Sequence, residues 1–187
     1  MIPGSIEKCE QEYTRNGTSG IIASRNIVTG KIVAPLIQPT RTEIDFVKHI
    51  ENVVQENPEN KHIFVMDQLN THKSELLVKF IAKQCEIDEE TLGVKGKSGI
   101  LKSMETRTEF LTDKTHNIQI VYTPKHCSWL NQIEIWFSII SCSVLNKRAS
   151  FASVEKLEEK IKEYIDYYNK YLAKPFKWTY SGKVLCA

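Results

Sequence analysis

The chain has 187 residues, of which 41% are hydrophobic and 26% charged, and its formal net charge is +2. This composition is typical of a soluble globular protein, and the length allows one domain with a real core. No apolar run approaches the length that crosses a bilayer, which argues against a membrane protein. The five cysteines include no C-x-x-C pair, which favours reduced thiols in a cytosolic protein over a disulfide framework or a zinc site.

The pattern of residues 20–34 predicts a β-hairpin. Two short apolar runs, Gly20–Arg25 and Lys31–Ala34, flank the polar turn from Asn26 to Gly30. Strands joined by a turn of this kind are typical of a hairpin. Pro35 and Pro39 are expected to end the second strand or to place it at the edge of a sheet.

A helix is expected to follow the hairpin. Thr42 and Asp45 have the three-residue spacing of a capping box. Apolar residues then recur at helical spacing: Phe46, Val47, Ile50, Val53 and Val54. Asn57-Pro58 is expected to end this helix.

A polar cluster follows the most apolar short run of the chain. His62–Met66 has the pattern of a strand that is buried on both faces. Asp67, Asn70, Thr71 and His72 come directly after it, and ligand sites of open α/β sheets form at that end of a strand. The alternative is that Asp67 is only a loop residue or the cap of the next helix.

Residues 86–117 are rich in turns and charge and are expected to form an insertion loop. Gly93–Gly99 resembles a phosphate-binding loop, but Thr91 stands where that motif requires a glycine. A nucleotide site is therefore rejected. Three lysines in the loop could contact phosphates by charge alone, or could simply be solvated: Lys95, Lys97 and Lys102.

A carboxylate lies on a strongly amphipathic helix that is expected to begin at Trp129. Its apolar stripe has helical spacing: Trp129, Ile133, Trp136, Phe137 and Ile140. Asn131, Glu134 and Ser138 fall on the opposite side. One interpretation makes Glu134 a metal ligand or an acid–base group. The other makes Asn131 a helix cap and Glu134 its capping-box partner.

The remaining elements are simpler. Asn117–Thr123 alternates as a strand, and Ser153 caps a last helix with an apolar stripe and a charged face. Residues 173–187 are expected to form a C-terminal tail. Lys174–Trp178 interleaves lysines with aromatic residues, which suits nucleic acid or an aromatic anchor on the body of the protein.

Three blocks of this sequence resemble bacterial insertion-sequence transposases of the mariner-like DDE superfamily. The blocks are Phe64–Lys73, Tyr122–Ser138 and Pro175–Trp178. The resemblance implies an α/β fold of the ribonuclease H type, in which helices flank a central mixed sheet. It also implies that Asp67 is the second catalytic carboxylate and Glu134 the third.

The resemblance implies a chemistry and its partners. DDE enzymes cut and rejoin DNA with two divalent ions, Mg²⁺ or Mn²⁺, which carboxylates hold. DNA is then the partner, as transposon ends and as target. Other residues are expected to support the carboxylates or contact DNA: Asn70, His72, Asn131, Lys95, Lys97 and Lys102.

The first carboxylate of the family is expected to be missing. It precedes the segment that Glu12–Thr18 matches. Three glutamates come before the hairpin but not within a strand pattern, so none is assigned this role: Glu7, Glu10 and Glu12. Residues 1–187 are therefore expected to be one partial catalytic domain that lacks the first strand and leaves a sheet edge unpaired. Such a chain would need a complementing N-terminal segment or form a homodimer. The alternative is an inactive remnant that binds DNA or an intact transposase.

Further expectations concern location. Asp67 and Glu134 should approach each other, and the lysine loop should lie beside them. The chain is expected to be cytoplasmic, in a bacterial nucleoid, with no membrane partner.

Overall fold

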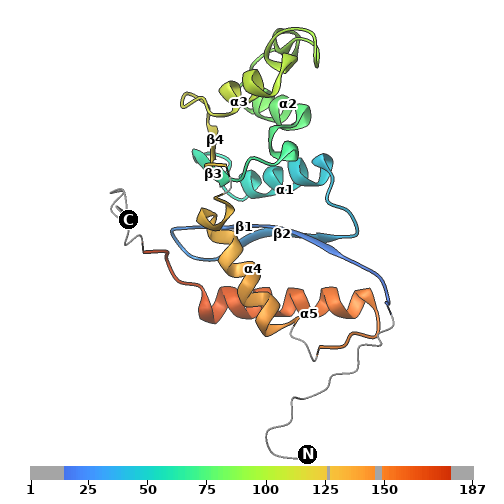
Figure 1. Ribbon diagram of the computed structural model, residues 1–187. Helices are drawn as coiled ribbons and strands as arrows, with labels where there is room; N and C mark the ends of the chain where they lie inside the picture. Colours follow the sequence, from blue (N-terminus) through green and yellow to red (C-terminus); the bar gives the residue numbers. More distant parts are fainter. Residues whose placement is uncertain (1–14, 126, 146–148, 178–187) are drawn as a thin grey trace, which may run out of the picture.

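The computed structural model describes residues 15–125, 127–145 and 149–177 (Figure 1). Its strands are β1 (Gly20–Arg25), β2 (Ile32–Gln38), β3 (His62–Met66) and β4 (Ile118–Tyr122). Its α-helices are α1 (Glu43–Gln55), α2 (Glu75–Gln84), α3 (Met104–Leu111), α4 (Gln132–Ser143) and α5 (Val154–Tyr167). The order of strands and helices makes this a mixed α/β protein.

The four strands form two separate two-stranded sheets. β1 and β2 are antiparallel, with Gly20 opposite Gln38 and Arg25 opposite Ile32. β3 and β4 are parallel and in register over five pairs. The expected central mixed sheet is therefore not continuous over the described residues. Both β1 and β3 keep one edge that no described strand pairs.

The hairpin is confirmed, and its second strand is longer than expected. The Asn26 side chain accepts hydrogen bonds from the backbone N–H groups of Val28 and Thr29, which fixes the turn. β2 continues through Pro35 to Gln38. β2 is an edge strand among the described residues, and an edge strand tolerates a residue without an N–H donor.

Helix α1 begins at the predicted capping box. The Thr42 hydroxyl accepts from the Asp45 N–H at 3.3 Å, and Asp45 Oδ2 accepts from the Thr42 N–H at 2.7 Å. The bond from the Thr42 backbone is the main reason that the pKa of Asp45 is lowered to about 2. The helix contacts the hairpin on one side and α2 on the other.

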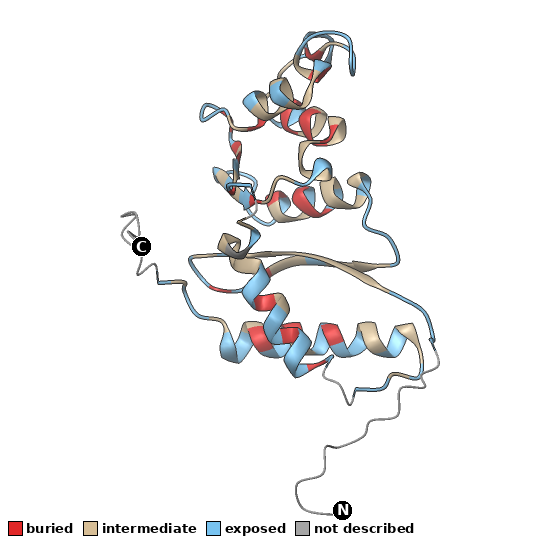
Figure 2. Ribbon diagram, viewed as in Figure 1, coloured by how far each residue is buried: buried red, intermediate tan, exposed pale blue. Residues whose placement is uncertain are grey.

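The described residues form two hydrophobic cores, one above the hairpin in Figure 2 and the other below it. The first is built from α1, α2, α3, β3 and β4, and the second from β2, α4 and α5. Residues 86–117 are more than a surface loop. They contribute Leu92, Leu101 and Leu111 to the first core, and each is at most 2% exposed.

The expectation that β3 is buried on both faces is wrong for the described residues. Phe64 and Met66 pack against the first core. Ile63 and Val65, which alternate with them, are 60% and 51% exposed. Side chains alternate between the faces of a strand, so one face of β3 is left without cover by the described residues.

His49 joins α1 to the hairpin. Its ring is 1% exposed, with Nδ1 2.9 Å from the Ala34 carbonyl and Nε2 2.8 Å from the Ser24 hydroxyl. Because a carbonyl only accepts, Nδ1 carries the proton and Nε2 accepts from Ser24 in the neutral ring. Burial lowers the pKa of His49 below its ordinary value of 6.5.

This burial predicts a loss of stability in acid. Below pH 6.5 the unfolded chain binds a proton at His49 more readily than the folded protein does. The free energy of unfolding therefore decreases as the pH is lowered through this range. Replacing His49→Gln should flatten that slope in urea unfolding series at several pH values. Gln55→Ala, at an exposed residue of the same helix that does not titrate, is the matched control and should keep the wild-type slope. Equal slopes for His49→Gln and the wild type would contradict the prediction.

Candidate active site

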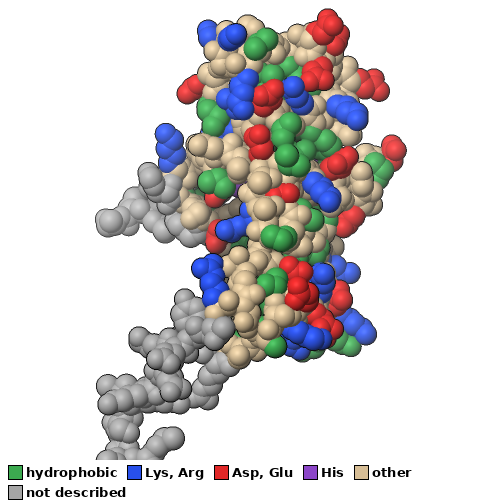
Figure 3. All heavy atoms as spheres, turned by 90° about the vertical axis from the view of Figure 1, so that its right-hand side faces the viewer, with side chains coloured by type: hydrophobic (Ala, Val, Ile, Leu, Met, Phe, Trp, Pro, Cys, Tyr) green, Lys and Arg blue, Asp and Glu red, His purple; other side chains and the backbone are tan. Residues whose placement is uncertain are grey.

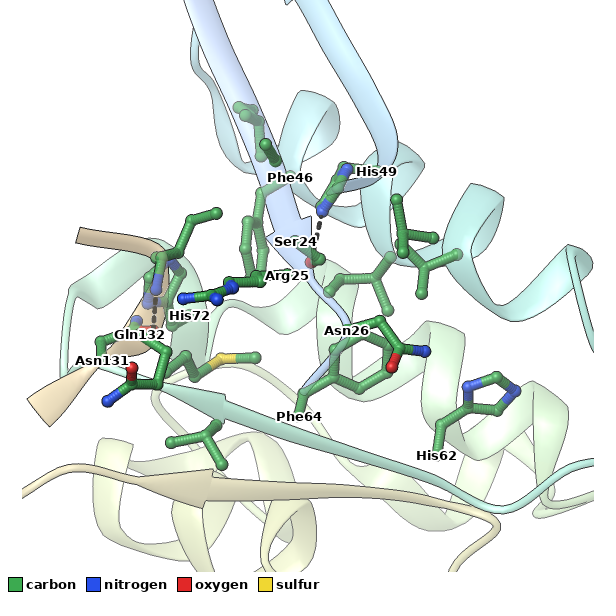
Figure 4. Close-up of a pocket in the computed structure, with 18 of the residues that line it drawn as sticks. Ser24, Arg25, Asn26, Phe46, His49, His62, Phe64, His72, Asn131 and Gln132 are labelled. Carbon is green, nitrogen blue, oxygen red and sulfur yellow. Dashed lines mark hydrogen bonds between the residues drawn. The ribbon is translucent and has the colours of Figure 1, made fainter. Parts of the chain in front are cut away.

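A cavity of about 880 Å³ lies between β1, β3, α1 and the start of α4. It contains four of the residues that the sequence predicted for the site: Asp67, His72, Asn131 and Glu134. Figure 4 shows His72 beside Asn131 and Gln132, with the hairpin residues facing them. The cavity therefore brings together residues of the two acidic sequence blocks.

Asp67 follows the last residue of β3 and is held by two hydrogen bonds. Its Oδ1 lies 2.7 Å from His72 Nδ1 and accepts from the Leu69 N–H at 3.2 Å. The carboxyl side chain is 39% exposed. One oxygen is thus fixed by the turn, and the group still reaches the cavity.

His72 orients Asp67 and is itself fixed on two sides. Its ring lies 4.3 Å from the Phe46 ring, and its carbonyl accepts from the Tyr122 hydroxyl at 2.7 Å. Burial raises the pKa of Tyr122 above its ordinary value, so this hydroxyl stays a donor. Because Nδ1 also donates to the Asp67 carbonyl at 3.1 Å, the side chain position is well determined.

Glu134 enters the cavity from the first turn of α4. The helix begins at Gln132, not at Trp129, because Asn131 caps it by accepting from the Ile133 N–H at 3.4 Å. The capping interpretation is therefore right for Asn131. The Glu134 backbone N–H donates to the Asn131 carbonyl at 3.0 Å, while its exposed carboxylate makes no hydrogen bond or ion pair with any described residue. Its carboxylate is free to bind a ligand.

Some predicted site residues lie elsewhere. Asn70 is exposed and does not line the cavity. The three lysines of residues 86–117 do not line it either: Lys95, Lys97 and Lys102. Lys95 forms an ion pair with Glu75 at 3.6 Å, near the start of α2. Any contact of these lysines with DNA would thus be made outside the cavity.

Two residues that were not predicted from the sequence also line the cavity. Arg25 Nε and Gln132 Oε1 are buried without a hydrogen-bond partner among the described residues. The sequence placed Arg25 at the end of a strand but gave no sign of which side it faced. Buried polar groups without partners are uncommon, so these two atoms could bond a ligand in the cavity.

The carboxylates suit a hard cation, but the set is small. Mg²⁺ prefers oxygen ligands and keeps several waters, so one or two carboxylates hold it in many sites. Asp67 and Glu134 provide two. Within residues 15–125, 127–145 and 149–177 no group of three His, Cys, Asp or Glu side chains is close enough to hold a metal.

Charge is mixed on the face of the molecule that Figure 3 draws. Acidic and basic side chains are interspersed there at both ends of the molecule. That face has no large area of one sign. Among the described residues, no helix is long and apolar enough to cross a membrane.

Comparison with known proteins identifies the family. Residues 1–158 match the family model described as the DDE superfamily endonuclease. The match covers most of the chain, so the chain belongs to this family. None of the curated proteins and none of the solved structures matches it significantly.

The arrangement around Asp67 predicts the effect of a change at His72. His72→Phe keeps a ring against Phe46 and removes the N–H that Asp67 accepts. The turn should then open more often, so the Leu69 amide should exchange its hydrogen several-fold faster. Hydrogen exchange followed by NMR measures this. The Thr115 amide, which donates to Asp113, is the internal control. An unchanged Leu69 rate would show that His72 does not hold the turn.

Proposed function

We propose that this chain is the catalytic part of a mariner-like DDE transposase from a bacterial insertion sequence, which cleaves and joins DNA strands. The observation that supports it best is that Asp67 and Glu134, 67 positions apart in the sequence, line one cavity. Membership of the DDE endonuclease family supports a nuclease reaction, and we assign that reaction to these two carboxylates as part of the proposal. The substrate would be DNA at the transposon ends and at the target, in the bacterial nucleoid.

Each residue has a proposed task. Asp67 and Glu134 would hold Mg²⁺ or Mn²⁺, which when bound activates the attacking oxygen and stabilises the leaving one. His72 keeps Asp67 in place through the 2.7 Å contact, and such supporting hydrogen bonds orient metal ligands. Asn131 sets the start of α4 and thereby the position of Glu134.

A second ion needs a third carboxylate beside this pair. We propose that a complementing segment supplies it, either from a longer protein or from a second copy in a homodimer. Glu7, Glu10 and Glu12 lie outside the described residues. The small donor set also favours a second candidate, an inactive remnant that binds DNA or an intact transposase.

Cleavage assays separate these candidates. Residues 1–187 should not cut DNA that carries the sequence flanking the gene, with Mg²⁺ or with Mn²⁺. A protein extended by the translated upstream sequence should cut it. Asp67→Asn or Glu134→Gln should lower that activity roughly 10²–10³-fold, because losing a metal ligand costs several kcal/mol of barrier.

The control for the cleavage assay is Glu51→Gln, an exposed carboxylate of α1 outside the cavity. It should leave the activity of the extended protein unchanged. Cleavage by residues 1–187 that disappears in Glu134→Gln would contradict the need for a complementing segment. Combined replacement of Glu7, Glu10 and Glu12 would then test whether one of them supplies the third carboxylate, and single replacements would identify it.

The three lysines of residues 86–117 are proposed to contact DNA beside the site. Changing Lys95, Lys97 and Lys102 together to Gln should weaken binding and lower the slope of log affinity against log salt by at most about 2.7. Fluorescence anisotropy with duplex DNA at several salt concentrations measures the slope. The matched control is the same change on α5, at Lys156, Lys160 and Lys162. Equal slopes for both variants would exclude a specific role for the 86–117 lysines.

A further inference from the structure

Arg25 is a cation in the cavity without an anionic partner among the described residues. It is the last residue of β1 and lines the cavity together with Asp67 and Glu134. Its Nε is buried and has no hydrogen-bond partner among the described residues. Asp67 is bonded to His72 instead, and no described carboxylate forms an ion pair with Arg25. Because a buried charged donor without a partner is unfavourable, this guanidinium is suited to an anionic ligand.

Phe176 restricts the position of the guanidinium. The Phe176 N–H donates to the Ile27 carbonyl at 3.0 Å, which ties the segment after α5 to the hairpin. The guanidinium carbon of Arg25 lies over the Phe176 ring, 5.9 Å from its centre. An arginine stacked on a ring uses its flat face, and its N–H groups remain available in the plane of the guanidinium. The ring therefore positions Arg25 without using its donors.

The Arg25 side chain points to the acidic end of the cavity. Figure 4 shows it extending from the hairpin toward His72 and Gln132. His72 is the residue whose Nδ1 lies 2.7 Å from Asp67, and Gln132 begins the helix that carries Glu134. The free donors of Arg25 thus face the elements that hold the two proposed metal ligands.

We propose that Arg25 binds a phosphate group of DNA in this cavity and that Phe176 positions it to do so. This role rests on the proposed DNA substrate and adds a contact for the backbone of the strand. A phosphodiester offers acceptor oxygens and a negative charge, and the planar guanidinium can donate two parallel N–H groups to it. Such a contact positions a strand without reading its sequence. Free phosphate has the same chemistry, so the two ligands are tested separately.

A purely structural role for Arg25 is the alternative. The contact with Phe176 could serve only to hold the segment after α5 against the hairpin. An apolar side chain would make that contact without leaving a buried donor unpaired. The charge and the free N–H groups of Arg25 are therefore better explained by a ligand.

DNA binding by residues 1–187 at several salt concentrations tests the proposal. With a labelled duplex and Mg²⁺ in fluorescence anisotropy, Arg25→Gln should lower affinity roughly 10-fold. The slope of log affinity against log salt should fall by about 0.9, because one phosphate contact is lost. Arg25→Lys keeps the charge and should keep the slope, with a smaller loss of affinity. The matched control is Arg15→Gln, at an exposed arginine outside the cavity, which should bind as the wild type does.

The positioning role of Phe176 has its own variants. Phe176→Leu removes the ring and should lower affinity several-fold while the salt slope stays the same, because the charge of Arg25 remains. Phe176→Tyr keeps the ring and should restore wild-type affinity. Thermal unfolding of each variant shows whether it is folded. Lower stability of Arg25→Gln with unchanged DNA affinity would overturn the proposal in favour of the structural role. Equal losses in Arg25→Gln and Arg15→Gln would overturn it as well.

NMR of the wild-type chain keeps the test valid if the variants do not fold. The Arg25 Nε–H signal should shift on addition of the duplex, and by more than that of Arg15. A shift with inorganic phosphate alone would overturn DNA as the ligand, and no shift with either probe would overturn the anion site. Cleavage by the extended protein with unchanged affinity in Arg25→Gln would overturn this role and leave the proposed function standing. An Arg25 contact in an extended protein that does not cut DNA would overturn only the proposed cleavage.

Discussion

The position of Glu134 depends on the burial of Trp136. The indole is 0% exposed and packs against Phe137 and Tyr168, whose ring centres lie 5.3 and 6.3 Å away. Residues two apart on a helix point to opposite sides. Burying Trp136 therefore turns Glu134 away from the core and toward the cavity. The cost is an indole N–H without a hydrogen-bond partner among the described residues.

The second carboxylate is positioned by a different element. Asp67 follows β3, whose register with β4 is fixed by five parallel pairs, and the turn after it is held by His72 and Tyr122. Each of the two hydrophobic cores thus fixes one acidic residue. The cavity lies where α1 joins the hairpin to the first core, because β1 and β3 do not pair with each other.

Local patterns predicted the elements well. The Thr42–Asp45 capping box, the hairpin turn at Asn26 and the Ser153 cap each lie where the sequence placed them. These features depend on residues only a few positions apart. The start of α4 was predicted too early, because the Asn131 cap interrupts an apolar stripe that begins at Trp129.

Long-range features were less predictable. The exposure of Ile63 and Val65 depends on which segment covers β3, and a short apolar run does not show that. The placement of Lys95 beside Glu75, outside the cavity, likewise follows from how residues 86–117 fold over α2. Asp67 and Glu134 came from a family resemblance, and their shared cavity came from the tertiary fold.

The central claim is that Asp67 and Glu134 bind one ion together. A double-mutant cycle on Mn²⁺ affinity, measured by calorimetry or electron paramagnetic resonance, tests it directly. The variants are Asp67→Asn, Glu134→Gln and the combination of the two. Shared coordination predicts that the double variant loses less binding free energy than the sum of the single losses, with a coupling of about 0.5–3 kcal/mol. Additive losses, or no loss in either single variant, would contradict a shared site.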